Sequence, residues 1–157
     1  MLYPLSYEGW GQPVTLLSRR GLPGPTIDRM PGWKVLLVDD DPVILKLLRV
    51  NFEMEGYLVV SATDGQEALQ AARAERPDVV LLDVMMPVMD GLDVSRALRA
   101  GEATRDLPII LLSAKAQASD LERGVEAGAD DYITKPFDPL ELLERVGQVL
   151  HRVRNNP

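Results

Sequence analysis

The residues of this sequence that could do chemistry stand directly after short apolar runs. Asp39 and Asp40 follow one such run, and Asp83 follows another. The third acid of the first group, Asp41, precedes Pro42, a pair typical of a helix start. Two carboxylates about 5 Å apart repel each other by roughly 3 kcal/mol at an effective dielectric constant of about 20. If the fold brings these acids together, the cluster predicts a bound cation.

A hydroxyl and an ammonium group, Ser113 and Lys135, follow two later apolar runs. The chain has no Cys and a single His, so a site with oxygen ligands and a hard cation is expected. Mg²⁺ fits best, because it uses one or two carboxylates, keeps several waters and commonly binds phosphoryl oxygens. A carboxylate beside Mg²⁺, with Lys and Ser to hold phosphoryl oxygens, could accept a phosphoryl group as an aspartyl phosphate.

Five short apolar runs alternate with amphipathic stretches and would position these groups. The predicted strands are 34–38, 57–61, 78–82, 108–112 and 131–134. Four of them are nearly continuous Val, Ile and Leu, which is typical of parallel strands covered on both faces. The pattern predicts an open, doubly wound α/β fold, in which the carboxyl ends of the strands meet at one edge. It does not determine the order of the strands.

Capping residues mark the predicted helices between these strands. Asp41-Pro42 and Asp90-Gly91 open two helices, and three glycines fit helix ends, namely Gly56, Gly101 and Gly128. Each of the other three helices is predicted to start at a cap three residues before a glutamate, at 64–67, 119–122 and 138–141.

Composition excludes several classes of protein. The chain has 157 residues, of which 46% are hydrophobic and 26% charged, as expected for one soluble globular domain. The absence of Cys excludes disulfide scaffolds, zinc fingers and iron–sulfur sites. The net charge of -7 argues against direct binding of nucleic acid. No apolar run approaches the roughly 20 residues that span a bilayer, and the start lacks a signal peptide, so we expect no membrane insertion and a cytoplasmic location.

Residues 1–32 differ from the rest of the chain. They hold five of the 12 prolines and five of the 12 glycines, and neither helical nor alternating apolar periodicity persists in them. The segment is therefore predicted to be a flexible N-terminal extension, followed by one domain over 33–157. A translation start at Met30 is the alternative explanation.

Four segments together resemble the receiver domain of bacterial two-component response regulators, of the chemotaxis-regulator type. They are 35–42 (VLLVDDDP), 78–91 with its core 83–91 (DVMMPVMDG), 112–114 (LSA) and 127–137 (AGADDYITKPF). The resemblance covers residues 33–152. It implies a single flavodoxin-like (βα)5 domain with a five-stranded parallel sheet in the order 2-1-3-4-5.

The resemblance also implies roles for the residues after the strands. Asp83 is the expected phosphoacceptor. Lys135 is expected to pair with this carboxylate and then with the phosphoryl group, which the Ser113 hydroxyl follows. Tyr132 is the expected switch aromatic, which moves inward when Ser113 is drawn to the phosphoryl group. The Lys135-Pro136 peptide bond is expected to be cis.

The same resemblance implies the ligands of the metal. Mg²⁺ is expected at Asp39, Asp40 and Asp83, with the main-chain carbonyl of Met85 as a further oxygen ligand. Helix capping accounts for Asp41 without any chemistry.

As a receiver domain, the chain is expected to be a phosphoacceptor switch and not an enzyme, with self-catalysed phosphotransfer and autodephosphorylation. A sensor histidine kinase or a histidine phosphotransfer protein would donate the phosphoryl group. Because the last helix is predicted to end near Arg152 with no DNA-binding module after it, the output is expected to be contact with a downstream protein. The expected output face is the fourth helix, fifth strand and fifth helix.

Three other functions are weaker alternatives. A haloacid-dehalogenase-like phosphatase could use Asp39 as its nucleophile with Asp41, but it would leave Asp83 without a role. A flavodoxin needs a hydroxyl-rich phosphate loop after the first strand, where the three acids here would repel phosphate. A phosphate-independent scaffold usually lacks the acceptor or the lysine, and both are present.

Overall fold

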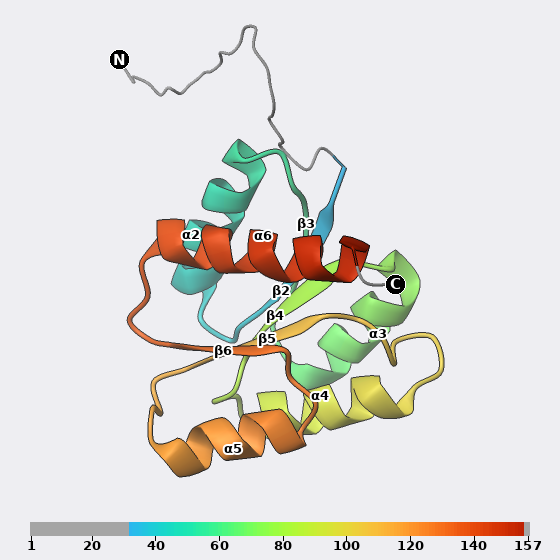
Figure 1. Cartoon of the computed structure of the whole chain (residues 1–157), viewed down its shortest axis with the longest axis vertical. Coiled ribbons are helices and arrows are strands. Elements are labelled where there is room, and N and C mark those ends of the chain that lie inside the picture. Colours follow the sequence, from blue (N-terminus) through green and yellow to red (C-terminus); the bar gives the residue numbers. More distant parts are fainter. Residues whose placement is uncertain (1–31, 156–157) are drawn as a thin grey trace, which may run out of the picture. The chain divides into compact units, whose positions relative to one another are not determined.

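The computed structural model describes residues 32–155, in which five strands alternate with five helices (Figure 1). The predicted extension, 1–32, lies outside the described residues except for Gly32. The elements, in chain order, are β2 (Lys34–Val38), α2 (Pro42–Met54), β3 (Leu58–Ala62), α3 (Gly65–Glu75), β4 (Val79–Asp83), α4 (Gly91–Ala100), β5 (Ile109–Ser113), α5 (Ala118–Glu126), β6 (Asp131–Thr134) and α6 (Pro139–Asn155).

All five strands are parallel and form one sheet in the order β3-β2-β4-β5-β6. Counted along the chain this is the order 2-1-3-4-5, so the expected flavodoxin-like topology is confirmed. Helices α2 and α6 cover one face of the sheet, and α3, α4 and α5 cover the other (Figure 1). The carboxyl ends of β2, β4, β5 and β6 therefore lie at one edge. Asp83 and Ser113 are the last residues of their strands, whereas Asp39, Asp40 and Lys135 follow theirs.

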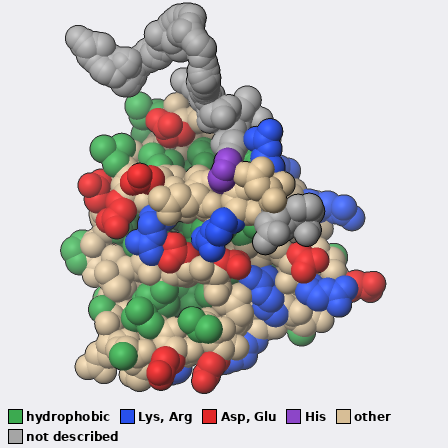
Figure 2. All heavy atoms as spheres, in the orientation of Figure 1, with side chains coloured by type: hydrophobic (Ala, Val, Ile, Leu, Met, Phe, Trp, Pro, Cys, Tyr) green, Lys and Arg blue, Asp and Glu red, His purple; other side chains and the backbone are tan. Residues whose placement is uncertain are grey.

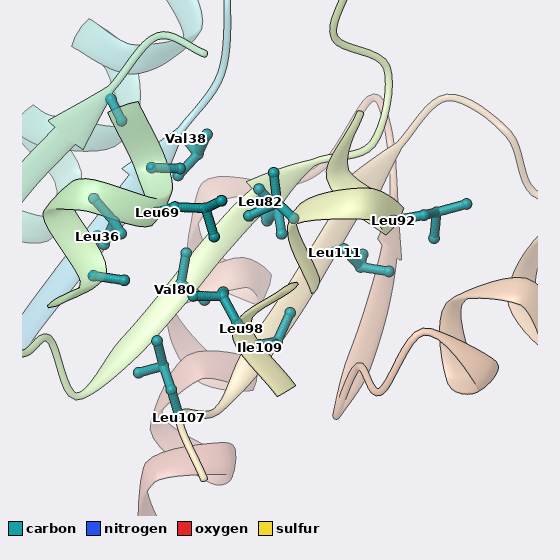
Figure 3. Close-up of a cluster of buried hydrophobic side chains, with 14 of the residues drawn as sticks. Leu36, Val38, Leu69, Val80, Leu82, Leu92, Leu98, Leu107, Ile109 and Leu111 are labelled. Atoms are coloured by element: carbon teal, nitrogen blue, oxygen red, sulfur yellow. The ribbon is translucent and has the colours of Figure 1, made fainter. Parts of the chain in front are cut away.

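The core lies between the sheet and its helices. Every residue of β4 and β5 is buried, as the continuous apolar runs predicted for strands covered on both faces. Figure 3 shows Val80, Leu82 and Ile109 from these strands in one cluster with Leu98 of α4 and Leu69 of α3. Removing this apolar surface from water is the main force that holds the layers together.

Aspartates cap four of the five described helices, namely α2, α3, α4 and α6. Asp41, Asp64, Asp90 and Asp138 each accept a backbone N–H from the first turn that follows, at 2.8–2.9 Å. Such caps satisfy amide groups that have no partner inside the helix. These four helix starts therefore follow from the aspartates in the sequence.

Two predicted helix boundaries are wrong. Helix α5 begins at Ala118, one residue before the predicted cap at Ser119. The carboxylate of Asp120 accepts the N–H of Gln117 at 3.1 Å, so the chain enters the helix earlier than the Ser119 pattern indicated. Helix α6 continues to Asn155, beyond the predicted end near Arg152.

Gly91 packs the start of α4 directly onto the end of β4. Its N–H donates to the Val84 carbonyl at 2.9 Å, and a Cβ at this position would collide with the main-chain carbonyl oxygen of Asp83. A residue without a side chain is therefore required where β4 meets α4.

None of the helices between residues 32 and 155 combines the length and the apolar character that crossing a membrane requires. On the face that Figure 2 shows, acidic and basic side chains are interspersed over the described residues. The excess of negative charge in the sequence is therefore not gathered on that face.

Candidate functional site

Two buried carboxylates share one lysine at the carboxyl edge of the sheet. Asp39 directly follows β2, Asp83 is the last residue of β4, and Lys135 directly follows β6. The Nζ of Lys135 donates to Asp39 Oδ2 at 2.9 Å and to Asp83 Oδ1 at 3.1 Å. Asp39 is 1% exposed and Asp83 is 3% exposed, so both carboxylates lie almost out of water, whereas the Lys135 side chain is partly exposed. The fold thus brings together three groups that are far apart in the sequence, as the strand ends predicted.

Asp40 completes an acidic cluster with the same two aspartates. Asp39, Asp40 and Asp83 each offer a carboxylate oxygen, and these oxygens lie within 4.8 Å of one another. Asp40 is exposed while the other two are buried, so the cluster opens to solvent on one side. Three carboxylates against one ammonium group leave an excess of negative charge, and an all-oxygen donor set of this kind fits Mg²⁺.

The titration of the two central groups reflects this excess. Burial raises the pKa of the Asp83 carboxyl and the neighbouring Asp39 raises it further, against the opposing effects of Lys135 and the Met85 N–H. Burial lowers the pKa of Lys135, but its hydrogen bonds to Asp39 and Asp83 outweigh this effect and leave its pKa raised. Lys135 therefore stays charged, and it does not fully compensate the repulsion between the acids.

Asp41 is separate from the cluster. Its Oδ1 accepts the N–H of Val43 at 2.9 Å at the start of α2, and its own N–H donates to Asp39 Oδ1 at 2.9 Å. Asp41 thus caps the helix and helps to orient Asp39, as its position before Pro42 indicated.

Ser113 and Tyr132 meet at the backbone of Lys115. Ser113 ends β5, is fully buried, and its Oγ accepts the N–H of Lys115 at 3.1 Å. The hydroxyl of Tyr132, on β6, donates to the Lys115 carbonyl at 2.8 Å. Ser113 lies one residue beyond Leu112, which pairs with Asp83 across the sheet, so this connection begins beside the acidic cluster.

The loop after Asp83 supplies contacts that the sequence did not indicate. The backbone of Met85 lowers the pKa of the Asp83 carboxyl, although sequence analysis assigned this residue only a carbonyl ligand role. The Met85 side chain is half exposed and, with Leu92, Lys115, Arg123 and Tyr132, lines a cavity of about 370 Å³ beside the site. The Lys135-Pro136 peptide bond is cis, as the resemblance implied.

The chain is similar in sequence to a known family and to several of its curated members. Residues 35–147 match the family model described as the response regulator receiver domain. The chain is 47% identical over 119 residues to the alkaline phosphatase synthesis transcriptional regulatory protein PhoP of Bacillus subtilis, covering 76% of this chain and 49% of that protein. It is 44% identical over 124 residues to the DNA-binding dual master transcriptional regulator RpaA of Synechocystis, covering 79% of this chain and 52% of RpaA. The chain therefore spans about half the length of the curated relatives that it matches.

Solved structures of single receiver domains match over nearly their whole length. The chemotaxis protein CheY4 of Vibrio cholerae is 36% identical with a TM-score of 0.72, covering 74% of this chain and 98% of CheY4. The receiver domain of the sensor histidine kinase PA1611 of Pseudomonas aeruginosa is 37% identical with a TM-score of 0.71, covering 76% of this chain and 98% of that domain. That structure is described with a magnesium ion coordinated in its active site cleft. The fold, the acidic edge and these matches agree, and the chain belongs to the receiver domain family of two-component response regulators.

Proposed function

We propose that Asp83 accepts a phosphoryl group from a phosphohistidine, with Mg²⁺ bound by Asp39, Asp40, Asp83 and the main-chain carbonyl of Met85. The donor is a sensor histidine kinase or a histidine phosphotransfer protein. The observation that carries this proposal is the position of Asp83, a buried carboxylate with Lys135 at 3.1 Å and two further acids whose oxygens lie within 4.8 Å. We also propose that the receiver domain comprises residues 33–157 and that 1–32 is a separate extension.

The chemistry is an in-line displacement at phosphorus. An oxygen of the ionised Asp83 carboxylate forms a bond to phosphorus while the bond from phosphorus to the donor's histidine nitrogen breaks, and that nitrogen regains a proton. Mg²⁺, when bound, supplies positive charge to the phosphoryl oxygens. Lys135 pairs with Asp83 before the transfer and with a phosphoryl oxygen afterwards. The Ser113 hydroxyl can donate to another phosphoryl oxygen while its oxygen still accepts the Lys115 N–H.

The added charge is what turns this chemistry into a signal. A phosphoryl group brings close to two negative charges at neutral pH. Drawing Ser113 toward it changes the backbone at Lys115, to which Tyr132 is hydrogen-bonded. We propose that this change alters the face formed by α5, β6 and α6, which contacts a downstream protein. The chain is in this sense a switch that catalyses its own phosphorylation and dephosphorylation, and not an enzyme with a separate substrate.

The names of the curated relatives bear on the output. They are transcriptional regulators, and this chain spans about half of their length. We propose protein contact as the output of the described residues. In a relative that carries a DNA-binding domain, the same face would act on that domain.

Mapping the labelled residue tests the proposal. The protein, Asp83→Asn and a matched control, Asp130→Asn, are incubated with acetyl phosphate and Mg²⁺, and the modified residue is located by mass spectrometry. We expect one phosphoryl group on Asp83 in the parent and in Asp130→Asn, and none in Asp83→Asn. Label on Asp39 would instead support the phosphatase alternative. Label on neither residue would contradict phosphoryl acceptance and favour a scaffold.

A further inference from the structure

Gly124 is an unexpected residue for its position. It lies inside α5 and is the only buried residue of that helix. Glycine destabilises the interior of a helix relative to alanine, because it loses more backbone freedom on folding. A glycine at a buried position inside a helix therefore indicates that a neighbouring group leaves no room for a side chain.

The ring of Tyr132 gives that reason. A Cβ at position 124 would lie 2.9 Å from Cδ2 of Tyr132 and 3.2 Å from Cδ1 of Leu111. Leu111 belongs to the buried strand β5, and its side chain is fully enclosed, so it has little room to move. The aromatic ring thus occupies the space that a side chain at 124 would fill.

Gly147 provides a contrast within the same domain. It lies inside α6, and a Cβ there would meet nothing within 4 Å. The two glycines share a helical backbone but differ in their surroundings. The absence of a side chain is required at Gly124 by packing and is incidental at Gly147.

The packed ring connects Gly124 to the acidic site. In this position the Tyr132 hydroxyl reaches the Lys115 carbonyl at 2.8 Å, and the Lys115 N–H reaches Ser113 Oγ at 3.1 Å. The ring also forms part of the wall of the cavity of about 370 Å³ beside the site. A side chain at 124 would push the ring away from α5, and the aromatic carbons move together with the hydroxyl that bonds Lys115.

We propose that Gly124 is a positioning residue for Tyr132. The missing side chain leaves space for the aromatic ring to pack against α5, and only in that position does the hydroxyl reach the backbone of Lys115 beside Ser113. Gly124 thereby sets how strongly a change at Ser113 is transmitted to α5 and β6. The role in transmission rests on the proposed function, whereas the packing of the ring against Gly124 does not.

Unfolding measurements test the packing. Gly124→Ala and Gly147→Ala are compared by urea unfolding in the parent and in Tyr132→Ala. We expect Gly147→Ala to raise the unfolding midpoint in both backgrounds. Gly124→Ala should lower the midpoint in the parent by clearly more than in Tyr132→Ala, where only the 3.2 Å approach to Leu111 remains, with a coupling of about tenfold in the folding equilibrium constant. In Tyr132→Phe, which keeps the ring, Gly124→Ala should again lower it.

Two outcomes would contradict the proposed packing of the Tyr132 ring against Gly124. If Gly124→Ala raises the parent midpoint as much as Gly147→Ala does, the ring does not fill the space at 124. If Gly124→Ala lowers the midpoint equally with and without the Tyr132 ring, the alanine is excluded by something other than Tyr132.

Ring resonances of Tyr132 test the transmission. The parent and Gly124→Ala, labelled in their tyrosine rings, are followed by NMR as acetyl phosphate and Mg²⁺ are added, and mass spectrometry records the phosphoryl group on Asp83. We expect equal phosphorylation of both proteins and a shift of the Tyr132 resonances that is largely lost in Gly124→Ala. Equal shifts in both would overturn the transmission role of Gly124. Absence of the phosphoryl group from the parent would instead contradict the proposed function. The urea unfolding of the variants would still test the packing of Tyr132 against Gly124.

Discussion

Both the amino ends and the carboxyl ends of the strands carry aspartates, but the partners of these carboxylates differ between the two edges of the sheet. At the amino edge, Asp78 accepts the N–H of Lys34 at 2.7 Å. Asp130 accepts the N–H of Ile109 at 2.8 Å and the guanidinium of Arg99 at 2.9 Å. Each acid there satisfies a backbone donor at the start of a strand, and the fold itself explains its presence.

At the carboxyl edge the acids outnumber their partners. Asp39 and Asp83 share the single ammonium group of Lys135, and Asp40 forms no ion pair within residues 32–155. Because both edges contain aspartates beside strands, the number of acids does not identify a functional site. The excess of acids over their cationic partners does distinguish the two edges, and it supports the proposed binding of a cation at the carboxyl edge.

Removing or adding metal should give the largest effect. Mg²⁺ at a hundred times its dissociation constant should raise the free energy of unfolding by about 2.7 kcal/mol, because it binds only the folded state. Asp40→Asn, at the exposed acid that we propose as a ligand, should lose most of this stabilisation, whereas Asp130→Asn should keep it. Urea unfolding with Mg²⁺ or with NaCl of equal ionic strength measures the difference. An equal response of the two variants would erase the distinction between the edges.

Removing an acid should have opposite signs at the two edges. Asp130→Ala should lower the free energy of unfolding by about 1.5–3 kcal/mol, because Arg99 and the Ile109 N–H lose a charged acceptor. In metal-free buffer at neutral pH, Asp83→Asn should raise it, because the repulsion with Asp39 is removed while Lys135 keeps one partner.

The pH dependence checks the sign for Asp83. Folding raises the pKa of this carboxyl, so its protonated form stabilises the fold below the unfolded pKa, and that contribution is lost as pH rises through the folded pKa. The advantage of Asp83→Asn over the parent should therefore appear over this window and persist above it. Metal-free urea unfolding as a function of pH measures it, and a variant less stable than the parent at neutral pH would contradict the account.

Much of this organisation could be predicted from local patterns. The strand runs and the aspartate caps encode the alternation of elements, and the residues after the strands predicted that Asp39, Asp83 and Lys135 would meet. Strand order is not a local property, and only the resemblance supplied it. The start of α5 was wrong because Ser119 mimics a cap, while the actual entry depends on Asp120 and the N–H of Gln117.

Tertiary contacts account for what the sequence did not reveal. That Lys135 bonds both Asp39 and Asp83 depends on side-chain geometry across three strands. The fit of Tyr132 against Gly124 joins a strand to a helix eight residues earlier, and no spacing rule distinguishes this glycine from Gly147. Such contacts exist only after the layers have packed.

Backbone strain should give the smallest effect. Each edge has one residue other than Gly with a positive φ, Arg76 at 49° and Val88 at 69°. At Val88, the N–H of Met89 donates to the Pro87 carbonyl at 2.8 Å, which closes a strained three-residue turn around a β-branched residue. Val88→Gly should raise the free energy of unfolding by about 1 kcal/mol, and Arg76→Gly by less.

A helical valine serves as the control for this strain. Val125 is exposed like Val88, but it lies in α5 with ordinary helical backbone, so Val125→Gly should lower the free energy of unfolding. Thermal and urea unfolding of Val88→Gly, Arg76→Gly and Val125→Gly measure these changes in the free energy of unfolding. If Val88→Gly is also destabilising, the turn after β4 is not strained.

The aspartate caps contribute to the net negative charge of the protein without belonging to the acidic cluster, so their effect on a charged partner can be measured separately. Asp41, Asp64, Asp90 and Asp138 serve the amide groups of four helices, and serine or asparagine caps a helix about as well as aspartate. Replacing all four by serine would change the net charge from -7 to -3 and leave Asp39, Asp40 and Asp83 in place. Such a protein would reveal how much of the rate of encounter with a charged partner comes from diffuse attraction at a distance.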